Sequence, residues 1–298
     1  MLDYARLNRS ILNQESVLCL PERADWADSP ILRKWREEFP LVLYRSLPEL
    51  GHSLRRQGVE VIYLTKPGPY DRILIPGVKN CVHAQFLCNE FHGDVYGYLS
   101  GWMSRVMTGR EDSFVPFFVP RLESAADLRA TLGISRMARV FGRHGGRDTF
   151  NIPFARTVVA QHALHHPEDH FVFLNTDPMR GTEKLPNVHY LPATVDAGEK
   201  AAFLRTCDVM IHARWHGETF GLAVGEFAVL GKPVLTYAGS RERAHLEMLG
   251  ASAHAYHHAR ELATLLECRE FPVSGETEYH RYAEPRRVME MFQRVFLS

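Results

Sequence analysis

In the second half of the chain, from Met137 onward, short apolar runs alternate with longer stretches whose apolar residues recur at helical spacing. The apolar runs have the length and the β-branched or aromatic content of strands, and the longer stretches fit amphipathic helices. This alternation predicts a parallel sheet wrapped by helices. The predicted strands are 138–141, 171–174, 188–191, 208–212 and 233–237. The predicted helices between them are 153–165, 197–205 and 222–230.

The first hundred residues repeat the pattern less regularly and predict a second α/β layer. The predicted strands of this layer are 17–20, 41–44, 59–64, 73–75 and 81–86. Helices are expected near 31–38 and 47–56.

A change from apolar to polar residues near 118–124 predicts the linker between the two layers. We therefore expect an N-terminal domain over 1–120 and a C-terminal domain over 121–275. The last stretch, 276–298, has apolar residues at helical spacing after Pro285 and predicts a helix that packs back toward the N-terminal domain.

Composition narrows the function classes. Of the 298 residues, 45% are hydrophobic, as in a globular chain, and 35 basic residues balance 35 acidic ones. The net charge of zero provides no general attraction for nucleic acid or an anionic membrane. The cysteines are five, widely spread and without a CxxC pair, which argues against a disulfide framework. We expect a cytoplasmic protein, because neither a signal peptide nor an apolar run of membrane-spanning length is visible.

Candidate chemistry is concentrated in one stretch, HARWHGETFGLAVGEFAVLGKPVL, which begins at His212. If 208–212 is a strand, Glu218 lies in the loop at its carboxyl end, where ligands bind in open α/β sheets. Glu226 follows about one turn into the next helix and is a good acceptor for paired hydroxyl groups. This spacing suits an elongated molecule with hydroxyls and a phosphate, such as a nucleotide sugar.

The residues between the two glutamates support that interpretation. Phe220, Gly221 and Leu222 begin a helix, whose free backbone N–H groups attract phosphates and hydroxyls. The alternative is that Glu218 caps the helix and Glu226 lies on a solvated helix face. Because the neighbours of Glu226 in the helix are apolar, an unpaired carboxylate there would be costly.

The frame formed by Glu218, seven residues and Glu226, with Phe-Gly-Leu inside it and Gly-x-Pro-Val after it, resembles the donor site of retaining glycosyltransferases of family 4. The resemblance implies the GT-B fold, in which two Rossmann-like α/β domains face a cleft, with acceptor binding in 1–120 and nucleotide-sugar binding in 121–275. It also implies that Glu218 contacts the donor sugar and that Glu226 contacts the ribose. The donor would be a UDP- or GDP-sugar, without a cofactor or a metal.

Two arginines extend the resemblance. The end of the strand at Val140-Phe141-Gly142-Arg143 resembles the family's Gly-Arg element, whose arginine faces the donor pyrophosphate. The family often has a lysine a few residues later, and here Arg147 is the only nearby substitute. A guanidinium neutralises phosphate with a different, bidentate geometry. The alternative for Arg143 is a surface residue that follows a strand.

The N-terminal half contains CVHAQFLCNEFHGDVYGYLSGWM, which begins at Cys81. It is similar to a viral and bacterial group within this family that has a His-Ala-x-Phe strand, a His-Gly-Asp-Val-Tyr helix start and the Gly-Glu-Thr-Phe-Gly-Leu motif. The similarity implies that His83, His92 and Asp94 line the acceptor side. The alternatives are a helix N-cap for Asp94 and a hydrogen-bonded core histidine for His83.

One departure concerns the beginning of the chain, which starts almost directly at a Leu2-Asp3-Tyr4-Ala5 helix. The resemblance leads us to expect that the usual first strand and its glycine loop are missing. This leaves open an impaired or non-catalytic nucleotide-sugar-binding scaffold. A phosphorylase or epimerase of the same fold, and a phage enzyme that glycosylates DNA bases, are further alternatives. The acceptor, a glycan, a small molecule or a modified DNA base, and the oligomeric state stay open.

Sixteen histidines raise the question of a metal. His162 and His166 are four residues apart on a predicted helix, but the sequence shows no third ligand for them. We therefore expect no metal site.

Overall fold

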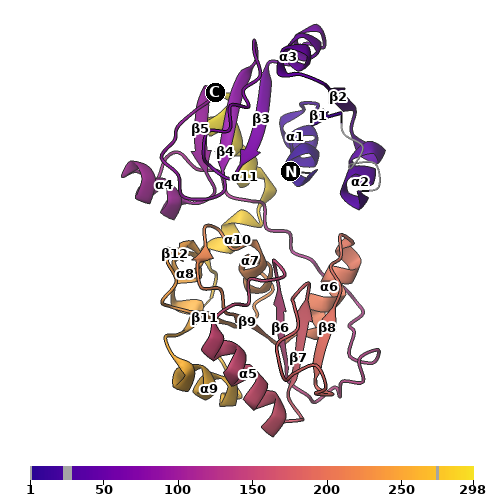
Figure 1. The fold of residues 1–298 in the computed structure, drawn as a ribbon, viewed down its shortest axis with the longest axis vertical. Helices are drawn as coiled ribbons and strands as arrows, with labels where there is room; N and C mark the ends of the chain where they lie inside the picture. Colours follow the sequence, from indigo (N-terminus) through magenta and orange to yellow (C-terminus); the bar gives the residue numbers. More distant parts are fainter. Residues whose placement is uncertain (1, 23–28, 273–274) are drawn as a thin grey trace. The chain divides into compact units, whose positions relative to one another are not determined.

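The computed structural model describes residues 2–22, 29–272 and 275–298. The chain divides into two compact units. The N-terminal unit combines Met1–Phe118 with Glu284–Ser298, and the C-terminal unit is Val119–Ala283. Figure 1 shows that the yellow C-terminal segment belongs to the same unit as the indigo N-terminus. The chain therefore passes between the units twice.

The C-terminal unit is built on a six-stranded, fully parallel sheet in the order β13-β11-β9-β6-β7-β8. The strands are β6 (Val140–His144), β7 (His170–Leu174), β8 (Val188–Leu191), β9 (Val209–His212), β11 (Val234–Tyr237) and β13 (Ala253–Tyr256). A small separate pair joins β10 (Gly217–Glu218) to β12 (Glu242–Arg243). The helices are α5 (Pro153–His165), α6 (Ala197–Thr206), α7 (Leu222–Ala228), α8 (Ala244–Leu249), α9 (Ala259–Glu267) and α10 (Glu278–Tyr282), and a short 3-10 turn spans Gly250–Ser252.

Helices cover both faces of this sheet, which explains why its strands are continuous apolar runs. On one face, Phe141, Phe171 and Ile211 form a buried core with residues of α5 and α9 (Figure 1). On the other face, α6 and α7 approach β6 at Gly142. A Cβ atom at Gly142 would lie 2.2 Å from the Cys207 sulfur, so only glycine permits this approach.

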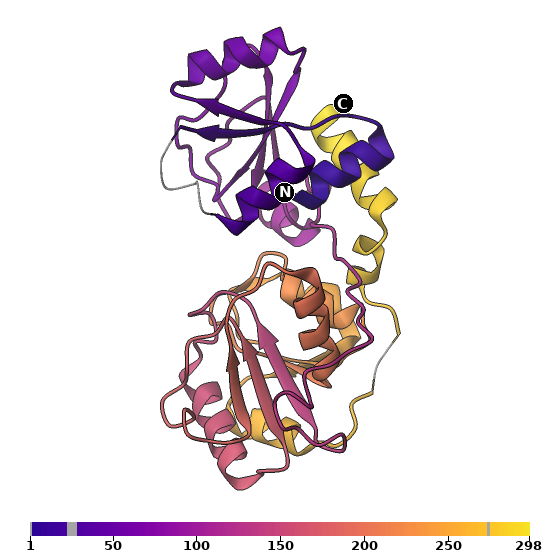
Figure 2. The same ribbon diagram turned by 90° about the vertical axis from the view of Figure 1, so that its right-hand side faces the viewer.

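The N-terminal unit contains a three-stranded parallel sheet in the order β3-β4-β5 and a separate parallel pair, β1-β2. The strands are β1 (Leu18–Pro21), β2 (Leu41–Tyr44), β3 (Val61–Lys66), β4 (Lys79–Ala84) and β5 (Val95–Tyr98). The helices are α1 (Leu2–Leu12), α2 (Pro30–Glu38), α3 (Leu47–Arg56), α4 (Gly101–Thr108), α11 (Pro285–Phe292) and a terminal π-helical turn, Gln293–Leu297. Helices α1 and α11 lie against each other, as Figure 2 also shows.

Aromatic side chains join the two ends of the chain within this unit. Tyr4 of α1 and Phe292 of α11 both contact Tyr63 of β3, with ring centroids 5.7 and 5.2 Å away. Phe296 also packs on Tyr63 at 5.5 Å. The last fifteen residues therefore complete the core of the N-terminal unit.

The predicted strands of the C-terminal unit are confirmed to within three residues at each end, the largest difference being at the end of β6. Three predictions were wrong. The segment 73–75 is not a strand, and the predicted helix start after His92 is strand β5. The single helix expected near 279–296 is two helices, α10 and α11, which belong to different units. Among the described residues, no helix combines the length and the apolar character needed to cross a bilayer.

Candidate functional site

The strand order of the C-terminal unit places a candidate site at one edge of its sheet. From β6 the chain adds β7 and β8 on one side, and it then returns to add β9 on the other side of β6. Such a switch point opens a crevice at the carboxyl ends of the two strands, where ligands bind in open α/β sheets. The carboxyl end of β6 carries Arg143 and His144, and that of β9 carries His212.

Glu218 is part of a polar network at this edge. Its Oε1 lies 3.2 Å from Nε2 of His212, and its Oε2 accepts a 2.7 Å hydrogen bond from Arg214. Nδ1 of His212 is 2.9 Å from the hydroxyl of Thr236 on the neighbouring strand. The Glu218 side chain is 20% exposed, so a ligand can reach it.

The environment of Glu218 keeps its carboxylate charged. Burial alone would raise the pKa of Glu218, but the hydrogen bond and charge of His212, together with Arg214, lower it overall. The strand pair β10–β12 holds the loop, and it depends on Gly217, where φ is 78° and a Cβ atom would lie 1.9 Å from the Glu242 carbonyl oxygen. Glu218 is therefore a fixed, ionised hydrogen-bond acceptor at neutral pH.

Glu226 lies in the interior of the unit and connects three elements. Its side chain is fully buried on α7, where Oε1 pairs with the ammonium of Lys200 from α6. Oε2 lies 2.9 Å from Nε2 of His144 at the end of β6, without the alignment of a hydrogen bond. Burial would raise the pKa of Glu226, but His144 and Lys200 lower it overall.

These contacts exclude the alternatives that the sequence left open for the two glutamates. The residue that caps α7 is Gly221, in a left-handed conformation with φ 82°, so Glu218 is not a helix cap. Glu226 is not on a solvated face. The turn between them is fixed by α10, since the hydroxyl of Tyr279 donates a 2.5 Å hydrogen bond to the Phe220 carbonyl. Leu222 then begins α7.

Arg143 is 3% exposed, so its interpretation as a surface residue was wrong. Its guanidinium donates to the hydroxyls of Thr176 and Thr149 and to the carbonyl of Gly146, the last at 2.8 Å. Burial lowers the pKa of Arg143 to about 10, against the opposing charge of nearby Glu218. Arg143 therefore connects the loops that leave β6 and β7 and remains positively charged at neutral pH.

Arg147 lies on the surface of the loop after β6. Its side chain is 75% exposed and forms a fork on Asp177, with nitrogen–oxygen distances of 2.9 and 2.7 Å. An exposed pair of this kind is weak and can open for another anion.

The acceptor-side candidates of the N-terminal unit are not assembled in the same way. His83 is completely buried on β4, with Nδ1 2.5 Å from the Tyr63 hydroxyl and Nε2 3.0 Å from the Tyr98 carbonyl oxygen. Burial lowers the pKa of His83 to about 4, so the ring is neutral at pH 7. The structure therefore favours the core-histidine interpretation of His83.

Asp94 and His92 lie near the beginning of β5. Asp94 is not a helix cap, because Oδ2 accepts a 2.7 Å hydrogen bond from the backbone N–H of Asn80 at the start of β4. This position is at the amino ends of the strands, whereas ligands in parallel sheets bind at the carboxyl ends. His92 is partly exposed, and its Nε2 lies 3.4 Å from the ammonium of Lys66.

Sequence reasoning missed the partners of the site residues. His212 and Arg214 lie in the stretch that contains Glu218, and Lys200 and His144 lie outside it, but no sequence pattern pairs any of them with a glutamate. The only available signal was the apolar surroundings of Glu226, which required a polar partner for the carboxylate without identifying it. Lys66 was missed as well. It is a buried lysine at the end of β3, 2.5 Å from Asp71 and 2.7 Å from the Ile73 carbonyl oxygen.

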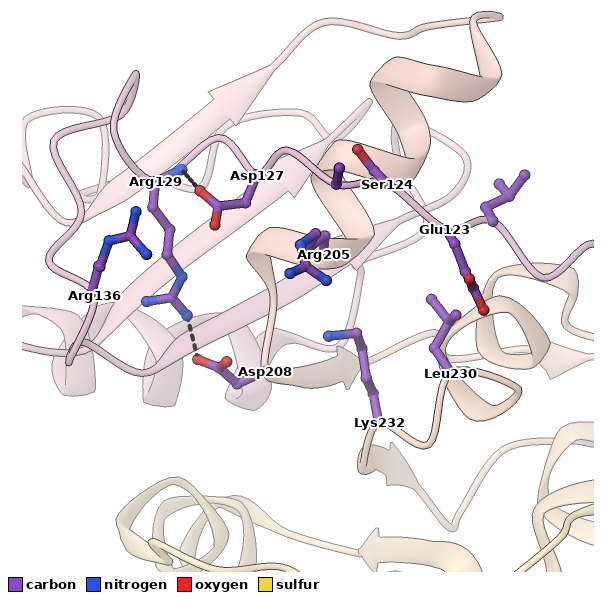
Figure 3. Close-up of a pocket in the computed structure, with 11 residues that line it drawn as sticks. Glu123, Ser124, Asp127, Arg129, Arg136, Arg205, Asp208, Leu230 and Lys232 are labelled. Carbon is purple, nitrogen blue, oxygen red and sulfur yellow. Dashed lines mark hydrogen bonds and ion pairs between the residues drawn. The ribbon is translucent and has the colours of Figure 1, made fainter.

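A large groove of about 750 Å³ lies elsewhere in the C-terminal unit (Figure 3). Asp208 and Lys232, which line it, precede β9 and β11, so the groove is at the amino ends of these strands. Within it, Arg129 pairs with Asp208 at 2.8 Å. None of the predicted donor-site residues lines this groove. We therefore place the candidate site by the topology of the sheet and not by the size of the cavity.

Known proteins support the architecture. No protein-family model matches the chain, and no curated protein matches its sequence. Among solved structures, Anabaena Alr3699/HepE in complex with UDP and glucose superposes with a TM-score of 0.68 at 14% identity, over 99% of this chain and 94% of HepE. WaaG, a glycosyltransferase involved in lipopolysaccharide biosynthesis, gives a TM-score of 0.58 at 14% identity, over 96% and 90% of the two chains.

The same architecture also occurs in a protein of Listeria monocytogenes described as a UDP-N-acetylglucosamine 2-epimerase. Its TM-score is 0.53 at 11% identity, over 93% of this chain and 95% of that protein. Taken together, the parallel sheets and these similarities show that the chain has the GT-B fold.

Proposed function

We propose that this protein transfers a sugar from a nucleotide-sugar donor, a UDP- or GDP-sugar, to an acceptor with retention at the anomeric carbon. The observation that carries the proposal is the polar network of Glu218, His212 and Arg214 at the switch point between β6 and β9. It is supported by the GT-B fold, which this chain shares with HepE in complex with UDP-glucose.

Glu218 would hold hydroxyls of the donor sugar. It is ionised, partly exposed and held by two partners, as a group that orients a ligand requires. It would orient the sugar and not attack it, so that the acceptor attacks from the side of the departing diphosphate. This front-face route comes from the resemblance to family 4.

Glu226 would hold the ribose hydroxyls once its present partner moves. Its carboxylate is fully buried, but the Lys200 side chain that covers it is 25% exposed and can turn toward solvent. Oε2 has no aligned hydrogen-bond donor within the described residues, so it has capacity to accept one from a hydroxyl. Binding of the ribose would replace the ion pair between Lys200 and Glu226 with hydrogen bonds from two ribose hydroxyls to the Glu226 carboxylate.

The departing diphosphate would be stabilised by fixed positive groups. Arg147 is the accessible guanidinium of the loop after β6, since it is held only by an exposed pair with Asp177. Arg143 would act as a positioning residue, because its donors are engaged by Thr149, Thr176 and Gly146. The backbone from Phe220 to Leu222 would line the sugar and the phosphate. This scheme uses no metal and no cofactor.

The acceptor side has three candidate residues, His83, His92 and Asp94. Of the three candidates, we retain His92 for acceptor binding, because it is partly exposed and lies beside the buried Lys66 at the carboxyl end of β3. A glycan or a small molecule fits a chain of zero net charge better than DNA does. We place the activity in the cytoplasm, in keeping with five cysteines that form no disulfide.

An epimerase acting on a nucleotide sugar is the second candidate function, supported by the similarity to the Listeria protein. The two activities differ in their products. A transferase without acceptor releases free sugar and nucleoside diphosphate slowly, whereas an epimerase converts the nucleotide sugar to its isomer.

The first experiment is a calorimetric titration of the wild type, Glu226→Gln and Glu261→Gln with a panel of nucleoside diphosphates and nucleotide sugars. Glu261 is an exposed glutamate of α9 that pairs with histidines, so it is a matched control. We expect one nucleotide class to bind the wild type and the control equally, and Glu226→Gln at least tenfold more weakly.

Chromatography of the bound nucleotide sugar after incubation then identifies the reaction. Free sugar supports the transferase, an isomer supports the epimerase, and an unchanged donor supports the non-catalytic scaffold. If the folded wild type binds no member of the panel, the proposed function is refuted.

A further inference from the structure

A cluster of two histidines and a glutamate lies where the carboxyl ends of α5 and α9 meet. The two helices pack side by side on one face of the sheet in the C-terminal unit (Figure 1). His162 lies in the last turn of α5, His166 is the residue that caps this helix, and Glu267 is the last residue of α9. One ligand atom from each of the three residues lies within 4.8 Å of the other two. The fold thus supplies the third group that the sequence did not show for this histidine pair.

The distances in the cluster fit the edges of a small coordination polyhedron. Oε1 of Glu267 is 3.0 Å from Nε2 of His166 and 3.5 Å from Nδ1 of His162. For a tetrahedral zinc site with bonds of about 2.0 Å, the ligand atoms are roughly 3.3 Å apart. Two edges therefore lie near the required length, and the third, between the two histidine nitrogens, is within 4.8 Å.

The remaining ring nitrogens face carboxylates, as in known zinc sites. Nε2 of His162 is 2.9 Å from Oδ2 of the buried Asp169. Nδ1 of His166 is 3.5 Å from Oε1 of Glu168. A histidine that ligates a metal commonly donates its other N–H to a carboxylate, which fixes the ring and its tautomer. The other two ring nitrogens, Nδ1 of His162 and Nε2 of His166, are the ones that lie close to Glu267.

Ion pairs alone explain the cluster less well. The two imidazole rings stack with centroids 4.3 Å apart, so protonation of both would bring like charges together. Two neutral imidazoles and one carboxylate are the ligands preferred by zinc and similar divalent ions.

We propose that His162 Nδ1, His166 Nε2 and the Glu267 carboxylate bind a divalent transition metal of the zinc class, with water as the fourth ligand. The ion would join two helices whose ligands are about one hundred residues apart in the chain. Helix α5 starts after β6 at the carboxyl edge of the sheet and ends at the amino edge, so the cluster lies away from Glu218. The ion therefore stabilises the C-terminal unit and takes no part in the proposed transfer.

The test uses the full chain, freed of metal with a chelator that is then removed, and titrated with Co²⁺ and Zn²⁺. We expect one Co²⁺ per chain, with the strong visible absorption of a four-coordinate site, and competition by Zn²⁺. His166→Ala and Glu267→Gln should each weaken binding at least tenfold. Both residues are partly exposed, so the substitutions leave the core intact.

Two control variants distinguish the site from ordinary surface histidines. His165→Ala removes a neighbouring histidine of the same helix, and Glu261→Gln removes an exposed glutamate beside two histidines. Both controls should bind Co²⁺ like the wild type. In addition, Zn²⁺ should raise the melting temperature of the wild type but not that of Glu267→Gln. The proposal is overturned if Co²⁺ does not bind at one equivalent, or if Glu267→Gln and His166→Ala bind it as tightly as the controls do.

Discussion

The two units carry predicted site residues of the same chemical types, yet they use them differently. In the C-terminal unit, Glu218 stands at the end of the sheet where ligands bind, in contact with His212 and Arg214. In the N-terminal unit, His83 lies inside the core and Asp94 ties together the beginnings of two strands. A polar residue in a recognisable motif is thus a stronger candidate for a binding site when the fold also places it at the carboxyl ends of the strands.

Electrostatics shows the same contrast. Glu218 has its pKa lowered by positively charged neighbours while its side chain remains partly exposed, so charge is available to a ligand. His83 has its pKa lowered by burial and has both ring nitrogens engaged, so neither charge nor a free nitrogen is available. The predictions below test this difference, beginning with the largest expected effect.

Replacement of Glu226 by Gln should lower the free energy of unfolding by about 3 kcal/mol, the lower end of the range for breaking a buried ion pair. The lower end applies because Lys200 is 25% exposed and can return its charge to water, while Glu226 is fully buried. Urea denaturation measures the loss.

Lys200→Met and the double variant complete a thermodynamic cycle for this pair. We expect the double variant to be more stable than Glu226→Gln alone, because Met leaves no charge without a partner. If the two single losses simply add, Lys200 and Glu226 do not form the pair described here.

Glu218→Gln should reduce kcat/KM for transfer, or for slow donor hydrolysis, about 100-fold, since a charged group that orients the sugar is lost. The amide preserves the size of the side chain but loses the ion pair with Arg214, so the free energy of unfolding should also fall, by less than for Glu226→Gln. Measurement of turnover with the identified donor tests this, and urea denaturation checks the fold. Unchanged turnover would remove Glu218 from the proposed donor site.

The sequence predicted most of the C-terminal sheet because parallel strands covered on both faces are continuous apolar runs. It failed at β5, a short strand that contains Gly97 and follows a His-Gly-Asp sequence resembling a helix start. Local patterns also placed Glu218 and Arg143 at strand ends. They could not identify Lys200 as the partner of Glu226, because the two residues come from helices that meet only in the folded chain.

For the histidines too, the correct interpretation depends on contacts with residues that are distant in the sequence. The sequence showed the four-residue spacing of His162 and His166, but Glu267 follows a hundred residues later and joins them only through the packing of α5 on α9. Likewise, nothing local distinguishes His83 from a site residue. Its interpretation depends on Tyr63 and Tyr98, which belong to the neighbouring strands.

His83→Gln should reduce the dependence of stability on pH. An unfolded histidine takes up a proton near pH 6.5, whereas His83 in the folded chain has a pKa of about 4. Its contribution is therefore fully present above about pH 6.5 and decreases as the pH falls toward 4. Between pH 7 and pH 5 this amounts to about 2 kcal/mol.

Urea denaturation across this pH range tests the His83 prediction. Near pH 5, the free energy of unfolding should change more steeply with pH in the wild type than in His83→Gln, by a difference equivalent to up to one bound proton. The affinity for the nucleotide should be the same in both proteins. A variant with an unchanged slope would show that His83 is accessible to protons in the folded state. The residue would then return to the list of candidate site residues.

The smallest effect comes from two matched arginines, one in each unit. Arg147 pairs with Asp177 at 2.7 Å with side-chain exposures of 75% and 47%, and Arg110 pairs with Asp112 at 2.6 Å with exposures of 77% and 49%. Replacement of either by Ala should change the free energy of unfolding by less than about 1 kcal/mol, as expected for exposed pairs.

Only Arg147→Ala should weaken nucleoside diphosphate binding, by about threefold to tenfold, because only Arg147 lies at the carboxyl end of β6. Equal affinities of the two variants for the nucleoside diphosphate, measured by calorimetry, would show that Arg147 does not bind it. A position at the end of a strand would then not suffice without a hydrogen-bond network like that of Glu218.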